Sequence, residues 1–126
     1  MRFTPVKPPR LFQVGLDRSI RIKDCARIQL KPNEQVTFVA PSGAEYDVAR
    51  KSWGYYATPS LNGRLQTFGL RGVLVQNSFG KLYLFLVGKG RVAQFRAYLK
   101  KEKQKIVCWL DSDKAVKRLV EKMGSR

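Results

Sequence analysis

The side chains of this chain that could do chemistry are cations and flat aromatic rings, and most of them fall in one continuous stretch. From Val48 to Lys101 the chain carries ten Lys or Arg residues, nine of its fourteen aromatic residues and no Asp or Glu. Cationic groups bind phosphates and carboxylates, while a flat ring can stack on a base. This combination is typical of a surface that binds a polyanion.

The first candidate segment within this stretch places three aromatic rings beside cations. Its candidate residues are Arg50, Lys51, Trp53, Tyr55, Tyr56 and Arg64. Cations beside stacking rings are the combination that proteins use to bind unpaired bases. Large aromatic side chains more commonly fill a core. We therefore expect most of this segment to be structural and one ring to be exposed.

The second candidate segment is the run Gly88, Lys89, Gly90 and Arg91, which precedes a predicted basic helix carrying Arg96 and Lys100. Glycine lets backbone N–H groups converge on an anion, and a helix N-terminus adds partial positive charge. The glycine spacing differs from that of nucleotide-binding loops, so an ordinary strand-to-helix turn is the alternative. A tight turn that carries two cations can still contact a phosphate.

The residues needed for common catalytic and metal sites are largely missing. The chain has no His, which excludes Ser-His-Asp and Cys-His machinery. Cys25 and Cys108 are too few for a zinc site, and we expect small, buried, reduced residues there. Glu45 and Asp47 could share a face for acid/base chemistry, but on an edge strand such a pair usually aids solubility. We predict no catalytic residue, metal or cofactor.

Alternating residues and turn signals predict a single small α+β domain with a defined order of elements. The expected elements are strands at 11–16 and 20–31, a hairpin of 35–40 and 44–50, a short helix capped by Thr58 and Pro59 and ended by Gly69, a second hairpin of 73–77 and 81–87, a helix at 91–101, a strand at 105–110 and a helix after Asp113. An irregularity is expected near Asp24 and Cys25.

Two features of the second half predict how its strands are arranged. The apolar run from Leu82 to Val87 is typical of a central strand, which is buried on both faces. The order of strand, helix and strand favours a right-handed parallel crossover.

At 126 residues the chain has the length of about one domain. Three prolines in the first nine residues predict an extended basic N-terminal arm over 1–10, followed by the domain over 11–126. The longest apolar run is far shorter than the roughly 18 residues of a membrane span, and no secretory signal is evident. We expect a cytoplasmic protein.

The overall charge selects a class of partner. With 25 Lys and Arg against 9 Asp and Glu, the net charge is +16, which attracts nucleic acid or acidic proteins at low salt. We favour a non-catalytic nucleic-acid-binding protein that contacts the phosphate backbone. RNA or a ribonucleoprotein is favoured over DNA, because no helix-turn-helix, zinc-finger or zipper pattern is present.

Two alternatives stay open. One is an accessory subunit that docks on an acidic protein or an anionic surface. The other is a small enzyme for a phosphorylated or acidic substrate, with a pocket that holds Lys89 or Arg91 beside Asp47 or another carboxylate. The sequence makes no prediction of oligomeric state.

Overall fold

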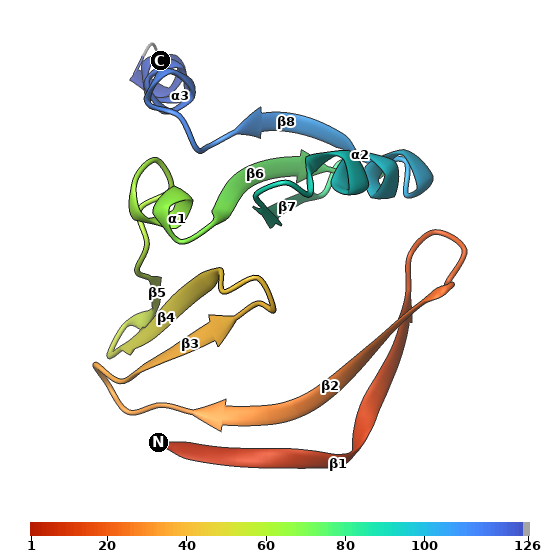
Figure 1. Cartoon of the computed structure of the whole chain (residues 1–126), viewed down its shortest axis with the longest axis vertical. Coiled ribbons are helices and arrows are strands. Elements are labelled where there is room, and N and C mark those ends of the chain that lie inside the picture. The colour runs from red at the N-terminus through yellow and green to blue at the C-terminus, as the bar shows by residue number, and fades with distance from the viewer. Residues whose placement is uncertain (125–126) are drawn as a thin grey trace. The chain divides into compact units, whose positions relative to one another are not determined.

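Alternating residues and glycine turns give this chain antiparallel strands along much of its length, as the computed structural model of residues 1–124 shows (Figure 1). Two units are distinguished: unit 1 comprises Met1–Val36 and Val48–Ala57, and unit 2 comprises Thr37–Asp47 and the chain from Thr58 onward. Residues 1–124 combine these strands with three helices, which confirms the α+β fold class. The predicted domain ends at 126, and its last two residues lie outside the described part.

Unit 1 contains a long two-stranded ribbon (Figure 1). It is formed by β1 (Arg2–Val14) and β2 (Ile20–Gln29), which pair in antiparallel fashion on both sides of one irregularity. Most of the segment 1–10, predicted as an extended arm, therefore lies in this strand, with residues 2–5 and Arg10 paired to β2. The irregularity expected near Cys25 is present. The extra residues lie in β1, where the register shifts between Pro5, which pairs with Ala26, and Arg10, which pairs with Asp24. Proline has no N–H to donate to a ladder, which explains why the pairing is interrupted there.

The second sheet is built from β3 (Gln35–Val39), β4 (Glu45–Lys51) and β5 (Gly54–Ala57), in that order. The predicted hairpin between β3 and β4 is confirmed: Gly43 has φ +89°, and its N–H donates to the Ala40 carbonyl at 2.8 Å. Because β4 lies between two strands, its acidic residues are not on an edge strand, contrary to the expectation from the sequence.

The sheet of unit 2 has the order β7-β6-β8, with β6 (Leu70–Gln76) antiparallel to both β7 (Leu82–Gly88) and β8 (Lys105–Trp109). β7 and β8 therefore run parallel to each other, and α2 (Val92–Lys101) connects them. This is the parallel crossover that the order of strand, helix and strand predicted. The prediction that β7 is central was wrong, since β6 occupies the centre. The two strands of this hairpin, β6 and β7, are both apolar. Which of them becomes the edge strand depends on the side at which β8 joins the sheet.

The core of unit 2 lies between this sheet and α2. Val73 and Val75 of β6 are fully buried, and Val87 and Leu99 complete the buried cluster. Phe95 packs against it from α2. Burial of such apolar side chains stabilises the fold by roughly 1.5–3 kcal/mol each.

The first helix is shorter than predicted. α1 (Arg64–Thr67) has Gly63 at its N-cap position, and the Ser60 hydroxyl accepts the Arg64 N–H at 2.9 Å. The predicted start at Thr58 was therefore wrong, because the turn that Ser60 stabilises delays the helix. Leu65 of α1 is fully buried. A Cβ on Gly72 of β6 would lie 3.0 Å from the nearest Leu61 methyl, so this glycine allows the α1 region to approach the sheet.

The last helix, α3 (Asp113–Gly124), begins as predicted, with the Ser112 hydroxyl accepting the Ala115 N–H at 3.0 Å. None of its described residues is buried. Among the helices that the structure describes, none is long and apolar enough to cross a membrane.

Candidate nucleic-acid interface

The β4–β5 hairpin of unit 1 exposes all three of its candidate rings. Trp53 lies at the hairpin turn with 73% of its surface exposed, and Tyr55 follows with 68% exposed. Tyr56 is also exposed, and as the next residue along β5 it points to the opposite face from Tyr55. The expectation of a single exposed ring was therefore wrong. β5 is an edge strand of its three-stranded sheet, and the side chains of Tyr55 and Tyr56 are exposed there.

The two cations that precede these rings are engaged inside unit 1. Arg50 pairs with Tyr55 across the hairpin, and its Nη1 donates to the Leu30 carbonyl at 3.0 Å. The Lys51 ammonium donates to Oδ1 of Asn33 at 2.9 Å. Both were predicted to bind phosphate, but these bonds use them to hold the hairpin in place. In the hairpin, the aromatic rings are therefore more accessible to a ligand than the two cationic groups.

The turn that supports Arg50 is closed by Glu34. The Glu34 carboxylate accepts the Lys31 N–H at 2.7 Å, and this hydrogen bond lowers the pKa of Glu34 from its ordinary value. The Arg50 N–H donates to the Glu34 carbonyl at 2.9 Å, so the same turn holds the backbone of β4. An ionised carboxylate at this point maintains the base of the hairpin.

Arg64, predicted as part of the same segment, serves a structural role in unit 2. Its Nη1 lies 3.6 Å from Oδ2 of Asp47, a buried carboxylate that also accepts the Thr37 hydroxyl at 2.7 Å. The guanidinium donates to the Thr58 hydroxyl at 2.7 Å and lies 5.1 Å from the Phe68 ring centroid. The sequence interpretation of Asp47 as a solvated residue was wrong, because this network keeps it buried.

The Gly88–Arg91 segment forms a strand-to-helix turn. Gly90 has φ +81°, which favours glycine, and the Lys89 N–H donates to the Gly69 carbonyl at 3.0 Å. The Arg91 N–H donates to the Gly88 carbonyl at 3.0 Å. Since these two N–H groups are already bonded, the turn offers phosphate its exposed Lys89 and Arg91 side chains rather than a cradle of backbone donors.

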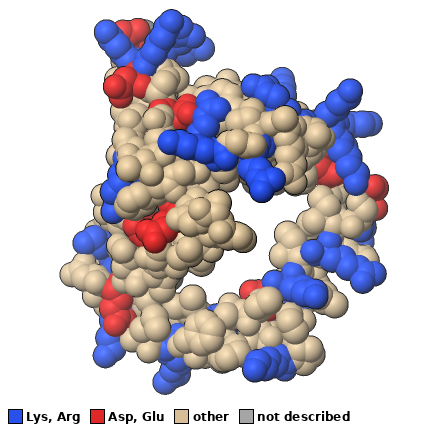
Figure 2. All heavy atoms as spheres, in the orientation of Figure 1, with Lys and Arg blue, Asp and Glu red and all other residues tan. Residues whose placement is uncertain are grey.

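Further cations follow along α2. Arg96 and Lys100 are exposed and lie one turn apart on the helix, so their charges reinforce each other. Neither forms an ion pair with any residue in the described part of the chain. Figure 2 shows Lys and Arg side chains on the surface around α2 and α3. Unit 2 therefore supplies charge that is free to meet an anion.

A polar hollow of about 400 Å³ adjoins the turn and is lined by Ser42, Glu45, Thr67 and Lys89, among others. The enzyme alternative requires a pocket that holds Lys89 or Arg91 beside a carboxylate. This hollow holds Lys89 beside the carboxylate of Glu45, while Asp47 is not among its lining residues. The carboxylate opposes binding of a free anion at this point. In residues 1–124 no cluster of His, Cys, Asp and Glu is arranged to hold a metal ion.

Two exposed surfaces were missed by the sequence interpretation. The ribbon leaves Phe3 and Phe12 exposed, and Cys25 in β2 is exposed rather than buried as expected, while Cys108 is half-buried. The β7 edge exposes Tyr83 and other large side chains. The alternation of apolar and polar residues in β2 indicated a strand with one apolar face. Whether that face is exposed depends on what packs against it, which the alternation does not show.

Comparisons with protein-family models, with curated proteins and with solved structures find no significant match to this chain.

Proposed function

We propose that this protein binds nucleic acid without catalysing a reaction. In this proposal the β4–β5 hairpin of unit 1 stacks unpaired bases, and the exposed cations at the start of α2 and along it contact phosphates independently. The observation that carries the proposal is the exposure of Trp53, Tyr55 and Tyr56 on one short hairpin. Stacking of a base on an aromatic side chain contributes about 1–3 kcal/mol and tolerates any sequence.

The distribution of charge supports the same proposal. Unit 1 contains ten Lys or Arg residues and three Asp or Glu residues, so a backbone near the hairpin meets a positive field. In unit 2, Lys89, Arg91, Arg96 and Lys100 form no ion pair within residues 1–124. Charge of this kind gives binding that depends weakly on sequence and strongly on salt.

Unpaired RNA is the favoured target. RNA presents unstacked bases in loops, bulges and single strands, and proteins bind these on aromatic rings. A ribonucleoprotein role follows if such a strand belongs to a larger RNA. DNA duplexes are disfavoured because a stacked base pair offers its edges, whereas the hairpin offers flat rings.

The proposal is tested by fluorescence anisotropy with a labelled oligouridylate and a labelled duplex of equal length. The wild type should prefer the single strand, and Trp53→Ala with Tyr55→Ala should weaken that binding by about tenfold or more, as expected for loss of about 1.4 kcal/mol of stacking. Phe79→Ala is the matched control, because Phe79 is 77% exposed at another hairpin turn.

Binding to Phe79→Ala should match the wild type. Equal losses in both variants would mean that the hairpin of unit 1 has no special role. A wild type that prefers the duplex would overturn the stacking proposal.

A further inference from the structure

β7 is an apolar strand that lies at the edge of its sheet. It pairs with β6 alone, so the backbone groups along its other side have no strand partner in the described part of unit 2. Leu82 and Leu84 are each more than half exposed, and Tyr83 is exposed between them. Folded proteins usually protect such an edge with charged residues, proline or a covering element. An edge of this composition is suited to pairing with another strand.

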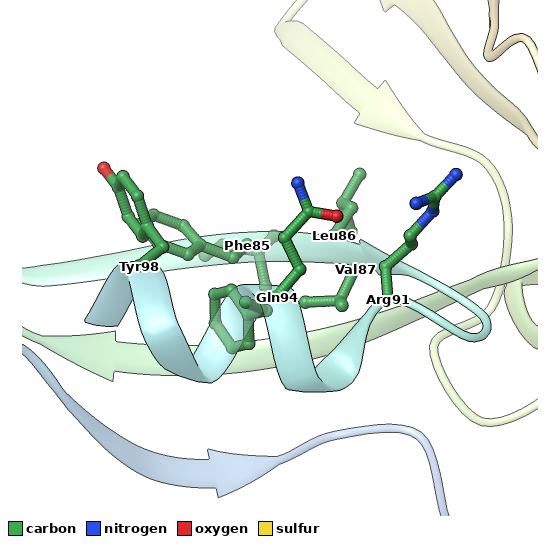
Figure 3. Close-up of a pocket in the computed structure, with 8 residues that line it drawn as sticks. Phe85, Leu86, Val87, Arg91, Gln94 and Tyr98 are labelled. Carbon is green, nitrogen blue, oxygen red and sulfur yellow. The ribbon is translucent and has the colours of Figure 1, made fainter. Parts of the chain in front are cut away.

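A groove of about 620 Å³ runs beside this edge, between β7 and α2 (Figure 3). Its floor is aromatic: the Phe85 ring lies 5.6 Å from Phe95 and 6.1 Å from Tyr98, measured between centroids. Arg91, Gln94 and Tyr98 line the helical side of the groove. Their spacing of three and four residues places them on one face of α2, as the view in Figure 3 shows.

These dimensions match a short extended peptide. From Arg91 to Tyr98 the helix rises about 10 Å, which corresponds to three or four residues of a β-strand at about 3.3 Å each. A strand added to β7 would direct alternate side chains towards α2, where the apolar floor could receive them. Gln94 lies between Arg91 and Tyr98 on the helix, and its side-chain amide can hydrogen-bond with polar groups of the peptide.

Charge decides which peptide fits. Arg91 is the one charged residue among those that line the groove, and Lys81 and Lys89 lie just before and just after β7. No Asp or Glu is among the residues that line the groove. A second copy of this chain would bring the same positive charge to the edge, and an RNA strand has no peptide backbone that could pair with β7.

We propose that the β7 edge and the β7–α2 groove form a docking site for an extended segment of a partner protein that alternates apolar and acidic residues. The segment adds to the sheet as a fourth strand beside β7. Its apolar side chains occupy the floor formed by Phe85, Phe95 and Tyr98, and a carboxylate pairs with Arg91. Arg91 also belongs to the nucleic-acid proposal, but the strand edge and the apolar groove do not, so this site stands or falls separately.

The test uses a fluorescein-labelled peptide of about eight residues that alternates Glu and Val, which is long enough to span the strand. Anisotropy should show saturable binding of this peptide and none of a counterpart that alternates Lys and Val. The same Glu and Val peptide with every backbone amide N-methylated should lose binding, because it has no N–H left to donate to β7. This last comparison changes only the ligand and therefore does not depend on the folding of any variant.

Variants locate the site on the protein. Arg91→Glu should weaken binding of the Glu and Val peptide by about tenfold or more. Arg118→Glu on α3 makes the same charge change outside the groove and should alter it by less than about threefold. Amide resonances of residues 82–86 should shift and become protected from hydrogen exchange when the peptide is added.

Four results would overturn the proposal: equal binding of the acidic and basic peptides, full binding of the N-methylated peptide, equal losses in both variants, or no change at the β7 amides. Dimerisation of the protein through β7 without any peptide would assign the edge to a second copy instead. Protection of the same amides from hydrogen exchange by oligouridylate would assign it to RNA.

Discussion

The β4–β5 hairpin and the β7–α2 region contain the same kinds of residue but use them in opposite ways. In the hairpin, Trp53 and Tyr55 are exposed while Arg50 is bonded to the Leu30 carbonyl. Around α2, the aromatic ring of Phe95 packs against Phe85 and Trp109, while Arg91, Arg96 and Lys100 form no ion pair within residues 1–124. The difference follows from layering, since α2 covers one face of the sheet in unit 2 and the hairpin end in unit 1 has no such cover.

This contrast separates two contributions to binding that composition alone cannot distinguish. Exposed rings contribute stacking, which is nearly independent of salt, whereas free cations contribute counterion release, which is strongly dependent on it. The two contributions can therefore be removed one at a time.

The largest effect expected is that of salt on the wild type. Each phosphate contact with a single strand contributes about 0.7 to the slope of log affinity against log salt. Contacts from Lys89, Arg91, Arg96 and Lys100 would give a slope of about −2.8, so raising salt from about 50 to about 200 mM should weaken binding about 50-fold. Anisotropy titrations with oligouridylate at several salt concentrations measure this slope. Binding that ignores salt would remove the cations of unit 2 from the account.

A smaller effect is expected when two cations of α2 are removed. Arg96→Ala with Lys100→Ala should weaken binding about five- to tenfold and reduce the salt slope by about 1.4. Lys117→Ala with Arg118→Ala on α3 removes the same charge and is the matched control. If the α3 double variant loses as much affinity for oligouridylate as the α2 double variant, the electrostatic attraction is diffuse, and the comparison between regions fails.

The smallest effect on binding is expected for Arg64, in contrast to its effect on stability. Arg64→Ala breaks the contacts with buried Asp47 and with Thr58, and should lower the free energy of unfolding by about 1–2 kcal/mol. Arg96→Ala should change it by less than about 0.5 kcal/mol. Urea unfolding measures both. If Arg64→Ala leaves stability unchanged but weakens RNA binding, Arg64 is a ligand-binding residue after all.

Local signals explain the parts of the fold that the sequence predicted. The hairpins depend on glycines such as Gly43 and Gly80, both of which adopt positive φ, and the start of α3 depends on the capping residue Ser112. These features act within a few residues of the chain. The start of α1 was mispredicted although it is also local, because Ser60 and Thr58 offer competing caps.

Long-range pairing explains what the sequence did not predict. The edge position of β7 depends on β8, which joins the sheet on the other side of β6 after α2 has intervened. The roles of Arg50 and Arg64 depend on Leu30 and Asp47, which are remote in sequence. An arginine in a basic segment has the same appearance in the sequence whether it meets solvent, a carbonyl or a buried carboxylate.

The most direct test of the central claim is the fluorescence of Trp53 during titration with oligouridylate. Trp53 is exposed, whereas the second tryptophan, Trp109, is half-buried and lies 3.9 Å, centroid to guanidinium carbon, beneath Arg71. Stacking of a base on Trp53 should quench the emission in proportion to the bound fraction, and Trp53→Phe should retain binding while losing most of this quenching. Undiminished quenching in Trp53→Phe, or saturation of the wild type without any quenching, would contradict the account.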